Sequence, residues 1–320
     1  MRVLLTGSRG WIGRYTAAKL LEDPEVELLG LGRSPPGPCF THDFAGRPAP
    51  LPEDLAAALD SPRRQELPIN LLDPALPSVV ADFGPQLVLH LASAPHDAEP
   101  ATAEANTVRA TSALVTALEA TGARLVLGST GSLYGEPERL PQDESHPTRP
   151  ESTYSRARLR AEERAAASPL PLLQARIFNV VGPGQPERFL PGSLAAQLAR
   201  ILRGQSPPVL RLGLLHATRD YIDVRDAAEA LVRLARSELL GPVNVGSGVE
   251  TPVQRIFDGL MARARERGAP DLEVVRSADR PVQLSRQQAG VARLRSLGFR
   301  PRFDLDRSLS DLLDWAIQAV

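Results

Sequence analysis

The sequence predicts an α/β fold built on a doubly wound parallel sheet, followed by a smaller α+β lobe. Two observations predict the sheet: short apolar runs alternate with longer amphipathic stretches as far as Phe178, and a glycine-rich segment directly follows the first apolar run. Alternating strands and helices form βαβ crossovers, which cover both faces of a parallel sheet with helices. After Phe178 the loops lengthen and the strands become short. We therefore expect one domain at residues 1–178 and a second lobe at residues 179–320, with some exchange of strands and helices between them.

The elements of the first half follow from this alternation. The expected strands are Val3–Leu5, Val26–Leu31, Leu67–Leu71, Leu87–Leu91, Arg124–Leu127 and Leu172–Ile177. The expected helices are Trp11–Leu21, Ala98–Thr121 and Ser152–Ala167. Eight prolines between Ser34 and Pro68 predict a surface excursion with one short helix at Glu53–Leu59.

The second half is expected to be mainly helical, with short strands between the helices. Its expected helices are Gly192–Arg203, Val224–Ser237, Thr251–Arg267 and Ser308–Ala319.

Composition excludes several classes of function. The 320 residues carry a net charge of -1, which gives no basic field for nucleic acid or an acidic membrane surface. No apolar run has the length of a membrane span, and the N-terminus shows no signal-peptide layout, so we expect a cytoplasmic protein. Cys39 is the only cysteine, and the five histidines are widely spaced. We therefore expect no internal disulfide and no metal site.

A glycine triplet lies between the first expected strand and the first expected helix. Gly7 and Gly10 allow a tight turn and a close approach of backbone N–H groups to a pyrophosphate, and Gly13 allows close packing of helix on strand. The helix N-terminus adds a favourable field for the negative charge. The segment predicts a Rossmann-type dinucleotide site formed by Gly7, Ser8, Arg9, Gly10, Trp11, Ile12 and Gly13. A plain tight turn between strand and helix is the alternative.

The end of the second strand bears on the choice of dinucleotide. Residues 30–34 contain no acidic side chain to bind the adenosine ribose hydroxyls. Arg33, together with Arg9, is suited to pair with a 2′-phosphate, so we expect NADPH as the cofactor, with NADH possible. The alternative is that Arg33 is simply a solvated arginine.

Two further motifs resemble those of the extended short-chain dehydrogenase/reductase family, also called the NAD-dependent epimerase/dehydratase family. One is residues 127–135, which include Thr130 and end in Tyr134-Gly135; the other is the Tyr154-x-x-x-Arg158 pair. The resemblance implies that Thr130 binds the substrate oxygen and that Tyr154 transfers a proton. Arg158 stands where the family has a lysine that holds the nicotinamide ribose.

The exchange of lysine for arginine has two physical consequences. Residues i and i+4 share a helix face, so Arg158 lies beside Tyr154. A cation ~4 Å away at an effective dielectric of ~20 favours the phenolate by up to about 4 kcal/mol. Arginine stays protonated and cannot relay a proton. Either Tyr154 still acts as the acid with slower proton delivery, or a water or a substrate hydroxyl provides the proton.

The resemblance extends over nearly the whole chain. It is carried further by residues 89–92, Asn106, residues 176–179 and 182–184, residues 219–224, residues 244–248 and residues 297–301. It implies additional cofactor contacts from Leu71, Leu91, Ala92 and Ser93, and substrate contacts from Ser93, Ser132, Asn179, Phe189 and Arg219. It also implies a small-molecule ketone as the partner, and a possible homodimer formed through the helices Ala98–Thr121 and Ser152–Ala167.

Further details of the sequence narrow the range of reactions expected within this family. Residues 182–226 are most similar to the branch of GDP-4-keto-6-deoxymannose reductases. Gly131-Ser132 replaces the Asp-Glu pair of the sugar dehydratases, which removes the acid and base needed to eliminate water. Leu214 and Gln283 stand where an asparagine and an aspartate are expected, which predicts a less polar cleft.

The preferred hypothesis is an NADPH-dependent ketoreductase that resembles the atypical angucyclinone ketoreductases and tailors an antibiotic or polyketide. The first alternative is a nucleotide-diphosphate 4-keto-6-deoxysugar reductase or epimerase. The second is a non-catalytic NADP(H)-sensing module that lost its chemistry when arginine replaced the lysine.

Overall fold

A seven-stranded parallel sheet organises the molecule and confirms the predicted fold. The computed structural model describes residues 1–33, 37–41, 47–276 and 284–320. The strand order is β12-β8-β7-β6-β1-β2-β5, and every neighbouring pair is parallel. The strands are β1 (Arg2–Thr6), β2 (Glu27–Gly32), β5 (Arg64–Pro68), β6 (Leu87–His90), β7 (Arg124–Thr130), β8 (Leu172–Ile177) and β12 (Gly241–Val245). The chain order therefore reverses at β1, and ligands of open α/β sheets bind at such a reversal.

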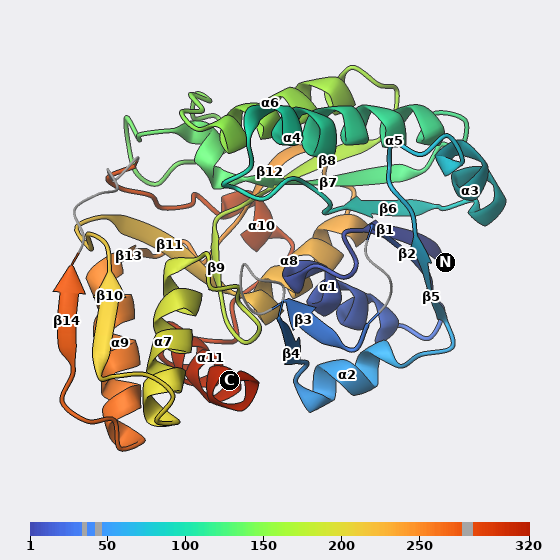
Figure 1. Ribbon diagram of the computed structural model, residues 1–320. Helices are drawn as coiled ribbons and strands as arrows, with labels where there is room; N and C mark the ends of the chain where they lie inside the picture. The colour runs from blue at the N-terminus through green and yellow to red at the C-terminus, as the bar shows by residue number, and fades with distance from the viewer. Residues whose placement is uncertain (34–36, 42–46, 277–283) are drawn as a thin grey trace.

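Helices cover both faces of this sheet (Figure 1). One face carries α3 (Leu76–Phe83), α4 (Pro100–Ala103), the π-helical segment η1 (Glu104–Arg109), α5 (Ala110–Leu118) and α6 (Thr153–Ala166). The other face carries α1 (Trp11–Leu21) and α8 (Val224–Arg236), with α2 (Glu53–Leu59) beside α1. A short hairpin of β3 (Cys39–Thr41) and β4 (Pro48–Pro50) lies near α2.

The second lobe lies beside the carboxyl ends of the central strands (Figure 1). Its three-stranded sheet contains β9 (Asn179–Val181), β11 (Thr218–Asp223) and β13 (Glu250–Pro252), and a second pair joins β10 (Val209–Leu212) to β14 (Glu273–Arg276). Its helices are α7 (Leu190–Leu202), α9 (Val253–Glu266), α10 (Ala292–Ser296) and α11 (Leu305–Ala319). Strand β12 and helix α8 come from this half of the chain but complete the main domain.

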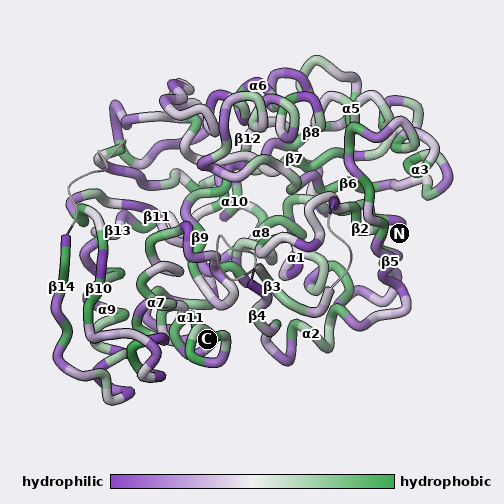
Figure 2. Tube along the Cα trace, in the orientation of Figure 1, coloured by the Kyte–Doolittle hydropathy of each residue, from purple (hydrophilic) through white to green (hydrophobic). Residues whose placement is uncertain are grey.

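Two apolar layers form the core, one on each face of the sheet. The layer under α3 and α5 is closed by Leu76, Val80, Leu114 and Leu118. The other layer continues from α1 and α8 into α7, α9 and α11 of the second lobe, so the two lobes share one core. Figure 2 shows the same pattern, with hydrophobic colour along the strands and inner helices.

Two expected elements differ in extent or continuity from the structure, and other elements were not expected. The strand expected at Leu67–Leu71 is β5, which begins at Arg64 and ends at Pro68. Ile69 N still donates to Gly32 O at 3.0 Å, and Ile69 and Leu71 then pack into the apolar layer under α3 and α5. The single helix expected at Ala98–Thr121 is divided into α4, η1 and α5. Helix α3 and the β3–β4 hairpin had no counterpart in the prediction.

None of the helices within the described residues has the length and apolar character that crossing a membrane requires.

Candidate active site

The turn between β1 and α1 has the shape of a phosphate-binding loop. Gly7 adopts a φ of 71°, and its N–H donates to Leu31 O at 2.9 Å. A Cβ on Gly13 would lie 2.0 Å from Gly7 O, and a Cβ on Gly7 would lie 2.8 Å from Ala92 N. These glycines therefore bring α1 onto β1 and leave the loop backbone open toward a ligand. The turn fits a dinucleotide pyrophosphate.

A cavity of about 260 Å³ adjoins this turn. Its wall includes seven residues predicted to bind the cofactor: Gly7, Arg9, Gly10, Arg33, Leu71, Ala92 and Ser93. The predicted residues Ser8, Trp11, Ile12, Gly13 and Leu91 lie in the loop or beside it, outside this wall. Asn70 and Asn106 also line the cavity, and neither was among the predicted cofactor residues.

Glu66 is a buried carboxylate behind the cavity wall that the sequence did not reveal. It accepts hydrogen bonds from Ser8 Oγ and Arg9 Nε, both at 2.9 Å, and from Arg64 Nη2 at 2.8 Å. A Cβ on Gly30 would lie 2.2 Å from Glu66 Oε1, so the glycine in β2 makes room for the carboxylate. Arg9 is therefore held by an ion pair with an internal partner, whereas Arg33 is exposed at the cavity wall.

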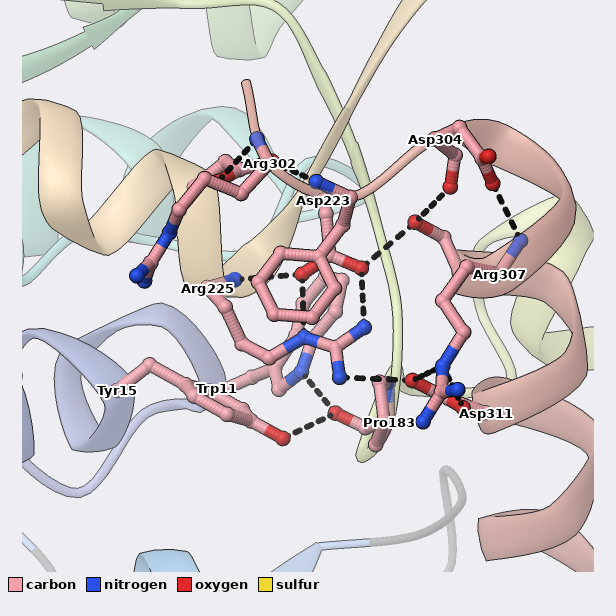
Figure 3. A network of polar contacts seen from close by, with 12 residues as sticks. Trp11, Tyr15, Pro183, Asp223, Arg225, Arg302, Asp304, Arg307 and Asp311 are labelled. Carbon is pink, nitrogen blue, oxygen red and sulfur yellow. Dashed lines mark hydrogen bonds and ion pairs between the residues drawn. The ribbon is translucent and has the colours of Figure 1, made fainter. Parts of the chain in front are cut away.

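Two aromatic side chains of α1 bind the start of the second lobe. Trp11 Nε1 donates to Pro183 O at 2.7 Å, and Tyr15 Oη donates to the same oxygen at 3.2 Å (Figure 3). The Trp11 side chain thus joins the cofactor loop to residues 182–184. The Nε1 hydrogen of Trp11 is therefore used within the protein.

Thr130 and Tyr154 are the predicted catalytic pair. Thr130 ends β7 and is buried, and its Oγ1 accepts from Ser132 N at 3.2 Å, which leaves its own hydrogen to donate. Tyr154 lies in the first turn of α6, where Ser152 and Ser155 form a reciprocal cap. Tyr154 Oη accepts from Arg158 Nε at 3.3 Å. The arginine therefore places positive charge beside the phenol, as the i, i+4 spacing predicts.

The Arg158 guanidinium is bound on its other sides as well. Nη1 donates to Gly128 O and Nη2 donates to Ser93 Oγ, both at 2.7 Å, and the side chain is almost fully buried. His90 lies nearby and contacts Thr6 and Thr111. Burial, and then the charge on Arg158, lower the pKa of His90 to about 3, so this imidazole stays neutral.

Two predicted substrate residues of the second lobe differ in how far their polar groups are already used by contacts within the protein. Asn179 Nδ2 donates to Gln287 Oε1 at 2.9 Å and to Asp220 O at 3.3 Å, which commits its amide group to the protein. The Arg219 guanidinium donates to its neighbouring carbonyl, Thr218 O, at 2.7 Å, and burial lowers its pKa. Within the described ranges no ion pair neutralises Arg219.

Phe189 belongs to an aromatic group at the start of α7. Its ring stacks on His96 with a centroid distance of 5.6 Å, and the Arg188 guanidinium lies over the ring, 5.3 Å from its centroid. The charge of Arg188 interacts with Tyr154 and Asp97. Arg188 was not among the predicted site residues, because the sequence does not show that α7 begins beside Tyr154.

The family model described as "NAD dependent epimerase/dehydratase family" matches residues 3–246. The chain belongs to this family. Its members are NAD(P)-dependent oxidoreductases and epimerases, in agreement with the predicted enzyme class and dinucleotide cofactor.

Relatives and solved structures show what this family member is similar to. GDP-6-deoxy-D-mannose reductase from Pseudomonas aeruginosa is 30% identical over 259 residues, which cover 75% of this chain and 84% of that protein. dTDP-6-deoxy-L-talose 4-dehydrogenase (NAD(P)(+)) from Kitasatospora kifunensis is 30% identical over 336 residues, which cover 100% of this chain and 96% of that protein. The solved structure of RMD from Pseudomonas aeruginosa, complexed with NADPH, is 25% identical with a TM-score of 0.76, over 99% of this chain and 98% of that one.

The structure explains why this family member lacks the acidic pair of the dehydratases. A Cβ on Gly131 would lie 2.8 Å from two carbon atoms of the Phe178 ring. An aspartate at position 131 therefore does not fit without movement of Phe178. Of the two further predicted departures from the family pattern, Leu214 is exposed, and Gln283 lies outside the described residues.

Proposed function

We propose that this chain is an NADPH-dependent reductase that converts the ketone of a nucleotide-diphosphate 4-keto-6-deoxysugar into a secondary alcohol. The observation that carries the proposal is the Tyr154–Arg158 pair, which is joined to β7 through Gly128 O and to the wall of the dinucleotide cavity through Ser93. The two relatives named above act on deoxysugar nucleotides and support the sugar substrate. The polyketide ketone that the sequence favoured finds no support in these relatives, so the first alternative takes its place.

The cofactor site is assigned to residues of the β1–α1 turn and the cavity wall. Gly7 and Gly10 would hold the pyrophosphate, Arg33 the 2′-phosphate, and Asn70 and Leu71 the adenosine end. When bound, NADPH supplies a hydride to the carbonyl carbon of the substrate.

The chain's own side chains act on the carbonyl oxygen. Negative charge grows on this oxygen as the carbonyl is reduced, and hydrogen bonds from Thr130 Oγ1 and Tyr154 Oη stabilise it. Tyr154 then gives its proton to the oxygen. Arg158 stabilises the phenolate left behind but cannot replace the proton, so Tyr154 takes its new proton from water or from the substrate.

Arg219 supports a diphosphate in the substrate. Its guanidinium is partly buried, and no carboxylate of the described chain neutralises it. A buried cation without a partner is costly, and a phosphate anion would remove that cost. Strand β11 places Arg219 in the lobe that faces the carboxyl ends of the main sheet.

The test is a substrate panel with purified protein and NADPH. We expect NADPH oxidation with GDP-4-keto-6-deoxymannose or dTDP-4-keto-6-deoxyglucose, and none with a polycyclic aromatic ketone. Oxidation with the aromatic ketone alone would restore the polyketide hypothesis. Tight NADPH binding without turnover on any ketone would instead favour the sensing module.

A further inference from the structure

Arg158 replaces a lysine with a larger and planar group, which needs acceptors in fixed directions. The structure supplies three: Tyr154 Oη, Gly128 O and Ser93 Oγ. The first lies on the same helix and the second is a backbone carbonyl, which every residue type provides. Ser93 is the one acceptor outside α6 that depends on the identity of a side chain.

The hydrogen-bond direction at Ser93 is set by its surroundings. Its hydroxyl donates to Ala94 O at 3.1 Å, so an oxygen lone pair remains to accept from Arg158 Nη2 at 2.7 Å. Ser93 also lines the dinucleotide cavity. It therefore lies between the cofactor wall and the buried guanidinium.

We propose that Ser93 is a positioning residue that lets an arginine take over the electrostatic role of the lysine. By accepting from Nη2, it holds the guanidinium plane so that Nε faces the Tyr154 hydroxyl. This inference rests on the proposed function only in taking Tyr154 as the proton donor. Without the Ser93 hydroxyl, a buried N–H of Arg158 loses its partner, and the guanidinium turns away from Tyr154 to find another.

The four tyrosines of the chain allow a test that needs no substrate. Burial raises the pKa of Tyr15, and it raises the pKa values of Tyr134 and Tyr221 to about 12. Tyr154 is half-buried, and the difference between the wild type and Tyr154→Phe isolates its absorbance change from those of the other three tyrosines. The charged groups that interact with Tyr154 are Arg158 on its own helix and Arg188 before α7, and both arginines stay charged during the titration.

The experiment follows tyrosinate absorbance of the whole protein against pH. Tyr154→Phe should remove one ionisation step, which is thereby assigned to Tyr154. Ser93→Ala and Ser93→Gly should each move that step upward by about one pH unit, because the nearby cation is no longer held in place. Ser93→Thr keeps the hydroxyl and should titrate like the wild type. In an Arg158→Met background, Ser93→Ala should have no further effect.

Three results would overturn the proposal. These are an unchanged position of the Tyr154 step in both Ser93→Ala and Ser93→Gly, an equal shift in the Arg158→Met background, and a Tyr154→Phe titration that keeps every step of the wild type. The titration is independent of the substrate panel, so the two proposals can fail separately. A protein that reduces no ketone but titrates as described keeps the positioning role of Ser93 and loses the reaction.

Discussion

At the scale of single residues, the site contains one side chain that stays positively charged and another that stays neutral near neutral pH. Arg158 is a permanent cation beside Tyr154, and His90 stays neutral although it lies next to that cation. Neither changes its charge near neutral pH. In the proposed mechanism, the phenol is therefore the group of this cluster that moves a proton.

Arg33 is predicted to select NADPH over NADH. It is exposed at the cavity wall, while Arg9 is already paired with Glu66. Arg33→Gln should weaken NADPH binding by about tenfold, the loss of one exposed charge-assisted contact to the 2′-phosphate. NADH lacks that phosphate and serves as the matched control, so its dissociation constant should hardly change. Calorimetric titration measures both, and an equal loss for the two cofactors would exclude this role.

His90 is predicted to make stability depend on pH. Its pKa in the folded protein, about 3, lies below its ordinary value of 6.5, so the unfolded chain binds the proton first as the pH falls. The resulting stability is present above pH ~6.5 and is lost toward pH ~3; at pH 5 the loss from this group is about 2 kcal/mol. Urea unfolding at pH 8 and pH 5 should show a smaller pH effect in His90→Gln than in the wild type.

The exposed His216 provides the control for this measurement. His216→Gln should leave the difference between the two pH values unchanged. If His90→Gln behaves like His216→Gln, then the buried imidazole does not cause the acid sensitivity.

At the scale of elements, local patterns predicted most helices and strands. The predicted bounds of α1, α2 and β8 agree with the structure. The division of the α4–α5 helix was not predictable, because no proline or glycine interrupts residues 104–118. Likewise, Pro68 ends β5 in the ladder, while the apolar residues after it suggested that the strand continues.

The β1–α1 turn gives the sharpest prediction at this scale. Gly13→Ala places a Cβ 2.0 Å from Gly7 O, so helix and strand must separate. We expect the free energy of unfolding to fall by about 1–3 kcal/mol, with NADPH binding weakened in parallel. Gly213→Ala is the control, because a Cβ there meets no atom within 4 Å. Normal NADPH affinity in Gly13→Ala would show that the turn does not hold the pyrophosphate.

At the scale of the whole molecule, a polar network joins the lobes around the cofactor turn (Figure 3). Arg225 donates to both carboxylate oxygens of Asp223 at 2.8 Å and to Asp311 Oδ2 at 2.7 Å. These contacts connect β11 and α8 to α11, while Trp11 and Tyr15 bind Pro183 beside them. The cofactor turn and the second lobe are therefore held in one arrangement.

Removing Arg225 should destabilise the protein strongly. Arg225→Met leaves the Asp223 carboxylate, which is fully buried, without its cation. Loss of one partner from a buried pair costs about 3 kcal/mol or more in the free energy of unfolding. Arg307→Met removes an exposed cation from Asp311 and should cost under about 1 kcal/mol. Urea unfolding of both variants gives the comparison, and similar losses would contradict the importance of the buried pair.

The sequence predicted the parts of the site that depend on local spacing and missed those that depend on tertiary contacts. The glycine turn and the Tyr154–Arg158 pair each lie within a few residues of chain. The ion pair of Glu66 with Arg9 requires β5 to pair with β2, and the bond of Ser93 to Arg158 requires β6 to lie beside α6. A possible homodimer formed through α5 and α6 stays a prediction.

The central claim is that a hydride passes from NADPH to a sugar ketone beside Tyr154. A single turnover with NADPH deuterated at the transferred position and GDP-4-keto-6-deoxymannose, analysed by mass spectrometry and NMR, tests it directly. The account predicts deuterium on the former carbonyl carbon with the wild-type protein, and a loss of about a hundredfold or more in rate with Tyr154→Phe. A product without deuterium, or an undiminished rate without the phenol, would contradict it.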